Sequence, residues 1–234
     1  MTVESEFLNE YDRYEDGLIR KFNETDFYSG FGSISKEKFT DYVLQLGHIS
    51  SEFVKFIEVA KLAVKLESGK EAVRSILRDE IPAVGPTHQD NRFSDLRKIG
   101  LTEEQILNTP KSKATARTIK NYYKLVGWPQ SDYDLKVLIT LRVLGEVLVG
   151  ETYKYVVQGL QKNYGLRPED SLFYSFHWKH DQKGGQGDEG GSGHTEYYDQ
   201  VLGELITDKE KLKVAKKAAL AAYKVRCKFN EQFL

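Results

Sequence analysis

The sequence predicts an all-α protein, and three observations lead to this prediction. Apolar residues recur at the spacing of an amphipathic helix in nearly every segment of the 234-residue chain. Only 5 prolines interrupt it, and no run alternates apolar and polar residues strongly enough to predict a sheet. Because 40% of the residues are hydrophobic, one sizeable core can form. We therefore expect residues 1–234 to form a single bundle-like domain of about seven to nine helices.

The helices predicted in the first half of the chain are bounded by local sequence signals. Their predicted ranges are 5–23, 36–67, 69–80, 88–98 and a short helix from 102. Ser35 suits the N-cap of the second helix, and Pro82 ends the third. Gly100 suits the end of the fourth, and Thr102 with Gln105 predicts a capping box at the fifth.

Similar signals bound the helices predicted in the second half. Their ranges are 110–126, 131–164, 168–182, 194–205 and 208–231. Pro168 suits the first turn of its helix, and Thr207 with Glu210 predicts a second capping box. Residues 182–193 are rich in glycine, which disfavours a helix interior. We therefore expect a Gly-rich loop insertion there.

Charge and composition exclude several classes of protein. The net charge of −1 provides no global attraction to nucleic acid or to an anionic membrane surface. The acidic start shows no export signal, and no stretch reaches the roughly 20 apolar residues of a membrane span. The single cysteine, Cys227, rules out an internal disulfide and suits helix packing better than a role as nucleophile. These features predict a soluble, cytoplasmic protein.

The segment FHWKHD carries two side chains whose spacing suits metal binding. His177 and Asp181 are four residues apart, so on a helix they share a face and can bind the same ion. The alternative is a surface His–Asp pair without a metal. His180 is adjacent to Asp181 and therefore points elsewhere, which predicts a structural or loop-facing role.

Glu146 is a carboxylate that the helical pattern directs toward the core. On a helix it lines up with an apolar stripe, made of Ile139, Val143, Val149 and Tyr153. A carboxylate in that position must be neutral, pair with a cation or bind a metal. Arg142, one turn earlier, offers an intrahelical ion pair with Glu146, and the alternative is that it anchors a substrate carboxylate.

Glu80 and His88 bracket the loop IPAVGPT, at the end of one predicted helix and the start of the next. Alone, they would indicate helix capping. Taken with Glu146, His177 and Asp181, they form a set of carboxylates and imidazoles on several helices. Di-iron and di-manganese carboxylate proteins build their centres in this way, and oxygen and nitrogen ligands without thiolates suit Fe or Mn.

These motifs resemble those of the haem-oxygenase-like di-iron proteins, and most closely those of the CADD-like group. The matching segments are RDEIPAVGPTH, LGEVLVG and FHWKHD, supported by LRKIGLTEEQI and YVVQGLQKNYGLRPED. The likeness runs from about residue 20 to the end of the chain and favours Glu146 over Glu151 as the ligand on the long helix. It implies a haem-oxygenase-like helical bundle that holds two irons and forms a homodimer.

The sequence departs from the family pattern after Asp181, where the family places its last histidine ligand three residues later. Gly184 occupies that position here. We expect the insertion 182–193 to enlarge the spacing, so that His194 supplies the ligand from the start of the next helix. The alternative is that the sixth ligand is lost. We also expect the loop to be mobile and to lie over the mouth of the cavity.

A second departure concerns the Chlamydia member of the family, which resembles a self-sacrificing synthase of p-aminobenzoate. Its early tyrosine has a counterpart in Tyr28, but Gly145 and Val156 stand where it has a later tyrosine and a lysine. The same self-sacrificing chemistry is therefore not expected. Gly145 and Gly150, on either side of Glu146, either leave room for a substrate or allow tight helix packing.

The sequence and the resemblance together predict an O2-activating non-haem di-iron oxidase or oxygenase. Two Fe ions, or Mn as the alternative, would be held by Glu80, His88, Glu146, His177, Asp181 and His194. Tyr28 and Arg142 are the candidate catalytic residues, and the partners are O2 and a small carboxylate of the amino-acid or fatty-acid class. Two alternatives stay open: a metal-free enzyme of this fold, thiaminase-II-like or pyrroloquinoline-quinone-synthase-like, and a non-catalytic interaction bundle.

Overall fold

The computed structural model describes residues 6–127, 131–183 and 194–234, apart from the side chain of His194. These ranges contain helices and no strand, so the all-α prediction is confirmed. Residues 184–193 of the loop predicted over 182–193 lie outside the described residues. The predicted mobility of the loop and its place over the cavity mouth therefore stay predictions. The elements are α1 (Glu6–Asn23), α2 (Asp26–Ser29), η1 (Phe31–Ser33), α3 (Lys36–Ala63), α4 (Glu67–Glu80), α5 (His88–Lys98), α6 (Glu103–Asn108), α7 (Lys113–Val126), α8 (Tyr133–Leu141), η2 (Arg142–Val147), α9 (Leu148–Tyr164), η3 (Pro168–Asp170), α10 (Tyr174–Asp181), α11 (His194–Leu205), α12 (Lys209–Asn230) and η5 (Glu231–Phe233).

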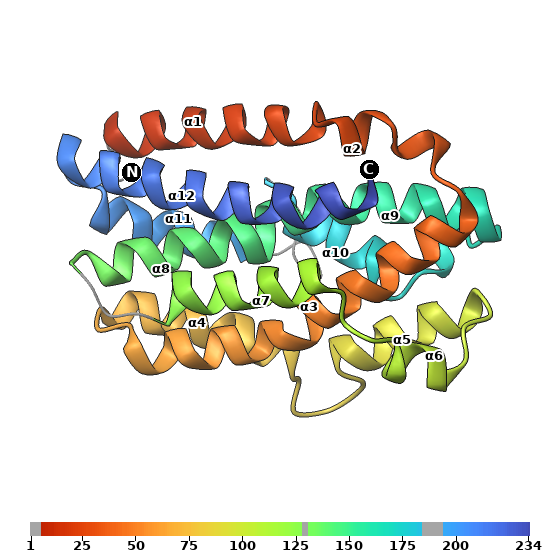
Figure 1. Cartoon of the computed structure of the whole chain (residues 1–234). Helices are drawn as coiled ribbons and strands as arrows, with labels where there is room; N and C mark the ends of the chain where they lie inside the picture. Colours follow the sequence, from red (N-terminus) through yellow and green to blue (C-terminus); the bar gives the residue numbers. More distant parts are fainter. Residues whose placement is uncertain (1–5, 128–130, 184–193) are drawn as a thin grey trace.

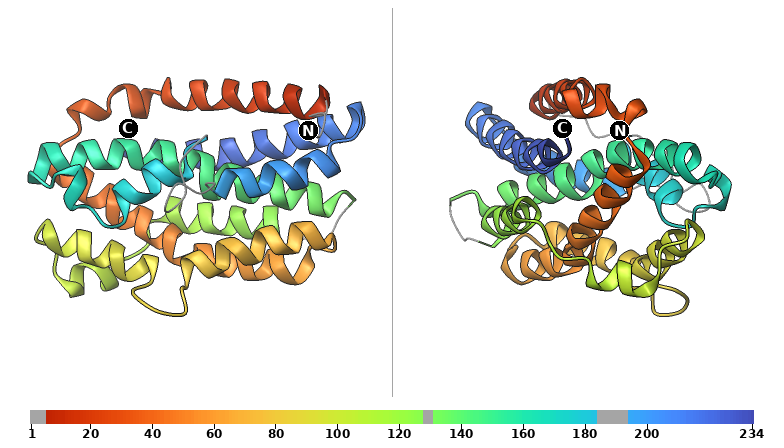
Figure 2. Two further views of the ribbon diagram at one scale, coloured as in Figure 1. Left: turned by 180° about the vertical axis from the view of Figure 1, so that it is seen from behind. Right: turned by 45° about the vertical axis from the view of Figure 1, so that its right-hand side comes forward.

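The long helices run side by side along the length of the molecule (Figure 1). Helix α1 lies along one side of the bundle and α4 on the opposite side, and α3 crosses obliquely from the end of α9 to the side of α4 (Figures 1 and 2). The consecutive elements α8, η2 and α9 form a rod through the middle (Figure 1). Buried apolar side chains from α1 through α12 pack into one hydrophobic cluster, because each helix turns its apolar stripe inward.

Several helix ends follow the sequence signals. The Ser35 hydroxyl caps α3, and Thr102 with Gln105 forms the predicted capping box of α6. At α12 the predicted box is wrong, because Asp208 rather than Thr207 caps the helix. Its carboxylate accepts a hydrogen bond from a backbone N–H of the first turn at 2.8 Å.

The rod through the middle contains a π-helical turn where the sequence predicts an uninterrupted helix. This turn, η2, spans Arg142–Val147 and includes Glu146. A π-helical turn holds more residues than an α-helical one, and such turns are frequent at functional sites. The wider turn shifts the register of the side chains of α9 relative to those of α8.

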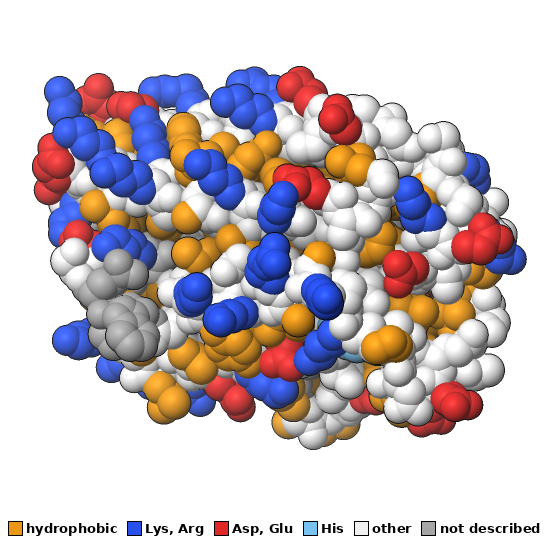
Figure 3. Space-filling view, in the orientation of Figure 1, with side chains coloured by type: hydrophobic (Ala, Val, Ile, Leu, Met, Phe, Trp, Pro, Cys, Tyr) orange, Lys and Arg blue, Asp and Glu red, His pale blue; other side chains and the backbone are white. Residues whose placement is uncertain are grey.

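The surface of the bundle carries both signs of charge. Lys and Arg side chains are numerous on the face formed by α1, α12, α8 and α7, interspersed with Asp, Glu and apolar side chains (Figure 3). Within the described ranges, no helix is both long enough and apolar enough to cross a membrane.

Candidate metal centre and its cavity

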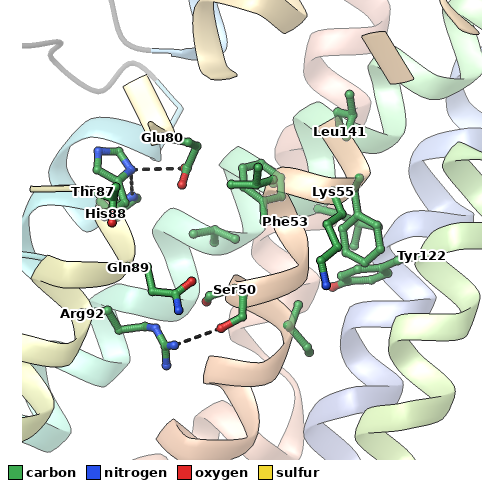
Figure 4. A pocket seen from close by; sticks show the side chains of 18 of the residues that line it. Ser50, Phe53, Lys55, Glu80, Thr87, His88, Gln89, Arg92, Tyr122 and Leu141 are labelled. Atoms are coloured by element: carbon green, nitrogen blue, oxygen red, sulfur yellow. Dashed lines mark hydrogen bonds and ion pairs between the residues drawn. The ribbon is translucent and has the colours of Figure 1, made fainter. Parts of the chain in front are cut away.

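Three of the predicted metal ligands lie together. The ligand atoms of Glu80, His88 and His177 are all within 4.8 Å of one another. His88 Nδ1 is 3.2 Å from Glu80 Oε1 and 3.1 Å from His177 Nε2. Figure 4 shows the Glu80 carboxylate and the His88 ring facing each other. One carboxylate and two imidazoles can hold one divalent metal ion.

Local structure fixes the two ends of the loop between Glu80 and His88. Glu80 is the last residue of α4, and His88 is the first residue of α5. Thr87 and Asp90 form a capping box, in which the Asp90 carboxylate accepts a hydrogen bond from the Thr87 N–H at 2.9 Å. This box holds the backbone at His88. The Thr-x-x-Asp pattern signals it in the sequence, although it was not among the predicted caps.

His177 is presented by α10, and it is only 5% exposed. Its Nδ1 lies 2.8 Å from the carbonyl oxygen of Phe173, one turn earlier. Because a carbonyl oxygen only accepts, Nδ1 carries the proton in this hydrogen bond. The lone pair of Nε2, which faces His88, is then available to a metal ion.

Asp95 joins α5 to α10, and it was not singled out from the sequence. Its buried carboxylate accepts hydrogen bonds from the segment that begins α10, namely from the Ser171 hydroxyl (2.7 Å), the Leu172 N–H (2.8 Å) and the Phe173 N–H (2.9 Å). The helix predicted over 168–182 accordingly divides into η3 and α10. Since α5 carries His88 and α10 carries His177, this cap sets the spacing of the two ligands.

Glu146 and Asp181 are buried, and both are 1% exposed. Asp181 accepts a hydrogen bond from His180 Nδ1 at 2.9 Å, so His180 faces the interior and has a structural role. Burial and the nearby Glu146 carboxylate raise the pKa of Tyr198, which places Glu146 close to α11. Neither carboxylate joins the 4.8 Å cluster, which gains no further member within the described part of the chain.

His194 begins α11, as predicted. Its side chain falls outside the description, so its role as a ligand stays a prediction. The next residue is anchored to η2, because the Arg142 guanidinium donates a hydrogen bond to the Thr195 carbonyl. The start of α11 therefore lies against the turn that carries Glu146.

A cavity of about 610 Å³ lies beside the three clustered residues, which line part of its wall. Much of the remaining wall is apolar, formed by Phe53, Val54, Leu141, Leu144, Val149 and Phe173. Cavities of this size with mostly apolar walls and a few polar groups are typical of small-molecule sites. Two buried arginines, Arg92 and Arg226, also line it and were not singled out from the sequence.

Arg142 is held by protein partners on the α1 side of η2. Its guanidinium pairs with Glu15 of α1 (Nε–Oε1 2.9 Å, Nη2–Oε2 3.0 Å) and with Asp199 of α11 (2.9 Å). The predicted ion pair with Glu146 is therefore wrong, since another helix supplies the carboxylate. Arg142 is also absent from the described lining of the cavity, which does not favour it as a substrate anchor.

Tyr28, the other candidate catalytic residue, is buried in α2. Its hydroxyl lies 3.0 Å from Thr152 Oγ1 and 3.4 Å from the hydroxyl of Tyr42. Burial raises the pKa of Tyr28. It does not belong to the described cavity wall, and its catalytic role stays a prediction.

Gly145 and Gly150 provide space for different neighbours. A Cβ at Gly145 would lie 2.5 Å from the Phe53 ring, and both residues line the cavity. A Cβ at Gly150 would lie 2.5 Å from the backbone nitrogen of Gln182, directly after α10. Gly150 therefore allows α9 to pack tightly against the end of α10. Gly145 makes room for an aromatic side chain at the cavity wall.

The clustered side chains fit a non-haem iron or manganese ion. Two imidazole nitrogens and one carboxylate form the facial triad known from non-haem Fe(II) oxygenases. The hydrogen bond at His177 Nδ1 is the kind of support that orients a ligating histidine. The other predicted ligands belong to η2, the end of α10 and the start of α11; they are Glu146, Asp181 and His194.

Solved structures similar to this chain are found, whereas no protein-family model and no curated protein sequence matches it. A CADD-like protein of unknown function from Nostoc punctiforme has a TM-score of 0.73 at 16% identity, over 96% of this chain and 97% of that chain. A domain of unknown function with a haem-oxygenase-like fold from Shewanella denitrificans has a TM-score of 0.72 at 16% identity, over 97% of this chain and 91% of that chain.

A TenA family transcription regulator from a Silicibacter species is also similar. Its TM-score is 0.65 at 13% identity, over 98% of this chain and 97% of that chain. At such identities the likeness shows the fold alone. The chain has a haem-oxygenase-like fold, and CADD-like proteins are among its structural neighbours, as the resemblance implied.

Proposed function

We propose that this protein is a non-haem iron oxidase or oxygenase that uses O2 on a small substrate bearing a carboxylate. The observation that carries the proposal is the convergence of Glu80, His88 and His177 on one wall of a cavity. The donor atoms suit iron, and the cavity has the size of a small-molecule site. The proposal is compatible with structural neighbours that are CADD-like or haem-oxygenase-like.

The centre would hold two irons, with Glu146, Asp181 and His194 completing the ligand set. Glu146 and Asp181 are buried carboxylates close to elements that carry the clustered residues. Burying several carboxylates is costly unless cations neutralise them, and two divalent ions would do so. The number of bound ions distinguishes this proposal from a single-ion site made by the clustered residues alone.

Bound iron would supply the electrons that reduce O2. The residues of the chain prepare the site for this chemistry. The Phe173 carbonyl holds the proton on His177 Nδ1, which leaves Nε2 as the ligand atom. The Asp95 cap holds α10 against α5. The apolar wall, including Phe53, restricts water and favours the apolar part of a substrate.

Anaerobic loading of metal-free protein with Fe(II), followed by O2, tests the proposal. Elemental analysis should find two irons per chain, and a small carboxylic acid should accelerate O2 uptake. Glu80→Ala and His88→Ala should lower iron content and O2 uptake together. His48→Ala is the control, because His48 is half-buried on α3 and outside the described cavity wall.

Three results would count against this proposal. Protein that retains no iron would exclude it, and so would O2 uptake that is the same in wild type, Glu80→Ala and His88→Ala. One iron per chain would exclude the two-iron centre and leave a single-ion site.

A metal-free enzyme of the same fold is the second candidate, because a TenA family protein and a TenA homologue are structural neighbours. Thiaminase-II-like chemistry needs a cysteine nucleophile in the cavity. Cys227 is the one cysteine of the chain, and it lies on α12 outside the described cavity wall. Burial raises the pKa of its thiol, which lowers the thiolate fraction and disfavours this candidate.

A further inference from the structure

Two buried arginines line the cavity, and neither forms an ion pair with a carboxylate of the described residues. Arg92 of α5 is 5% exposed, and Arg226 of α12 is 1% exposed. Their described hydrogen bonds go to hydroxyl groups, from Arg92 to Ser51 at 3.1 Å and from Arg226 to Thr152 at 3.0 Å. The Nε atom of Arg226 is buried without a hydrogen-bond partner.

A buried guanidinium without a counter-ion is energetically unfavourable, because arginine stays protonated in proteins. Arg142 shows how this chain satisfies such a group inside the fold, by pairing it with Glu15 and Asp199. Arg92 and Arg226 instead face a cavity. A ligand bound there can supply the negative charge.

The two arginines lie on either side of a third residue of the cavity wall, Tyr153, and both influence its hydroxyl. Arg226 binds the residue before Tyr153 on α9, and the Tyr153 hydroxyl bonds with Ser50 at 2.9 Å. Arg92 binds the residue after Ser50 on α3. Burial raises the pKa of Tyr153 to about 12, while Ser50 and both guanidinium groups act to lower it. Both cations therefore lie near this hydroxyl.

We propose that Arg92 and Arg226 form an anion site that binds the carboxylate of the substrate. A guanidinium presents parallel N–H donors that match the two oxygens of a carboxylate. The Tyr122 hydroxyl, buried in the cavity wall without a hydrogen-bond partner, is a further donor. The apolar walls suit an apolar body, so the ligand is a monocarboxylic acid with an alkyl or aromatic body.

The anion site lies apart from the clustered metal ligands. Figure 4 shows Arg92 pointing away from the Glu80–His88 pair, and Tyr122 on the far side of Phe53 from that pair. An acid held by its carboxylate at the arginines therefore turns another part of its body toward Glu80 and His88. This orientation rests on the proposed function, whereas the anion site itself requires no metal.

Ligand binding to metal-free protein tests the anion site, with isothermal titration calorimetry as the readout. The probes are octanoate and 3-phenylpropanoate, each compared with its uncharged amide. Wild type should bind each acid more tightly than its amide. Arg226→Met and Arg92→Met should each weaken acid binding at least about tenfold and leave amide binding unchanged, since truncation leaves the carboxylate without a buried partner.

Lys55→Met is the matched control for loss of a cation. Lys55 lines the cavity, but its side chain is 60% exposed and pairs with Glu52 at 3.2 Å. Acid affinity should therefore stay at the wild-type value. Arg226→Lys keeps the charge and loses the planar fork, so its affinity should lie between those of wild type and Arg226→Met. Circular dichroism verifies that each variant is folded.

Equal binding of acid and amide by wild type would overturn the anion site. No binding of either acid would do the same, and so would acid affinity that survives Arg226→Met and Arg92→Met. Tighter binding of octyl phosphate than of octanoate would indicate a phosphate site instead and also overturn it. If the metal-free protein binds the acids as expected but takes up no iron, the anion site stands and the proposed function falls.

Discussion

Buried arginines occupy two regions of this molecule, and the regions differ in how the charge is satisfied. On the α1 side, Arg142 pairs with Glu15 and Asp199. At the cavity, Arg92 and Arg226 meet hydroxyl groups and the open space of the cavity. In the first region the charge is neutralised by carboxylates of the protein. In the second region we expect an anionic ligand to neutralise it. Arg142 is therefore a cation that holds helices together, whereas we propose that Arg92 and Arg226 bind the substrate.

Removal of Glu15 should cause the largest loss of stability. Glu15→Ala takes away a carboxylate that accepts three hydrogen bonds from a guanidinium that is 1% exposed. Breaking a buried ion pair from one side costs about 3–5 kcal/mol in the free energy of unfolding. Urea unfolding followed by circular dichroism measures the loss. A loss below about 1 kcal/mol is typical of a surface ion pair. It would show that the Arg142 pair stabilises the fold no more than a surface pair does, and the two regions would then not differ.

Asp95 is a second buried charge that is satisfied within the protein. Asp95→Ala should lower the free energy of unfolding by about 2–3 kcal/mol, because it uncaps α10 and leaves buried N–H groups without an acceptor. Asp170→Ala is the control, since the Asp170 side chain is 43% exposed and pairs with Arg167 on the surface. That change should stay within about 0.5 kcal/mol. Equal effects of the two substitutions would show that Asp95 does not anchor α10.

Gly145 and Gly150, on either side of Glu146, allow the packing at the cavity wall to be compared with the packing between two helices. Gly150→Ala should destabilise the protein by about 1–3 kcal/mol, because the new Cβ meets the backbone of Gln182. Gly145→Ala should cost less, because its Cβ meets the far end of the Phe53 side chain, which can move toward the cavity. Thermal unfolding of both variants measures the difference. A larger cost at Gly145 would show that the cavity wall is as rigid as the helix contact.

Arg226→Met should have the smallest effect on stability. It removes a hydrogen bond to Thr152 but also a buried charge without a carboxylate partner among the described residues, so the loss should be about 1 kcal/mol or less. The same urea titration applies. A loss in the free energy of unfolding as large as that of Glu15→Ala would show that Arg226, like Arg142, mainly holds helices together. That result would count against the anion site.

The fold could be predicted because each helix repeats a local pattern. The end of α4 at Glu80 and the range of α5, His88–Lys98, agree with the prediction, since a proline-containing loop separates two amphipathic segments. The pattern also placed Glu146 in the core. Such features depend on neighbours within a few residues in the sequence, which is why they can be read without a structure.

The parts of the site that were missed depend on contacts between distant segments. Asp95 lies in FSDLRK, which resembles an ordinary charged helix face, and only the packing of α5 near α10 makes it a cap. Arg226 likewise lies among lysines of α12. The predicted Arg142–Glu146 pair was wrong because Arg142 pairs with Glu15 of α1 and Asp199 of α11. Local spacing rules cannot anticipate contacts between segments so far apart in the sequence.

Metal binding by Glu80, His88 and His177 is tested most directly by anaerobic calorimetric titration of metal-free protein with Fe(II). Wild type, His177→Ala and His48→Ala are compared under the same conditions. Wild type should bind Fe(II), His177→Ala should lose at least about tenfold in affinity, and His48→Ala should match wild type. Equal affinities of wild type and His177→Ala, or no binding by wild type, would contradict a metal centre at this cluster.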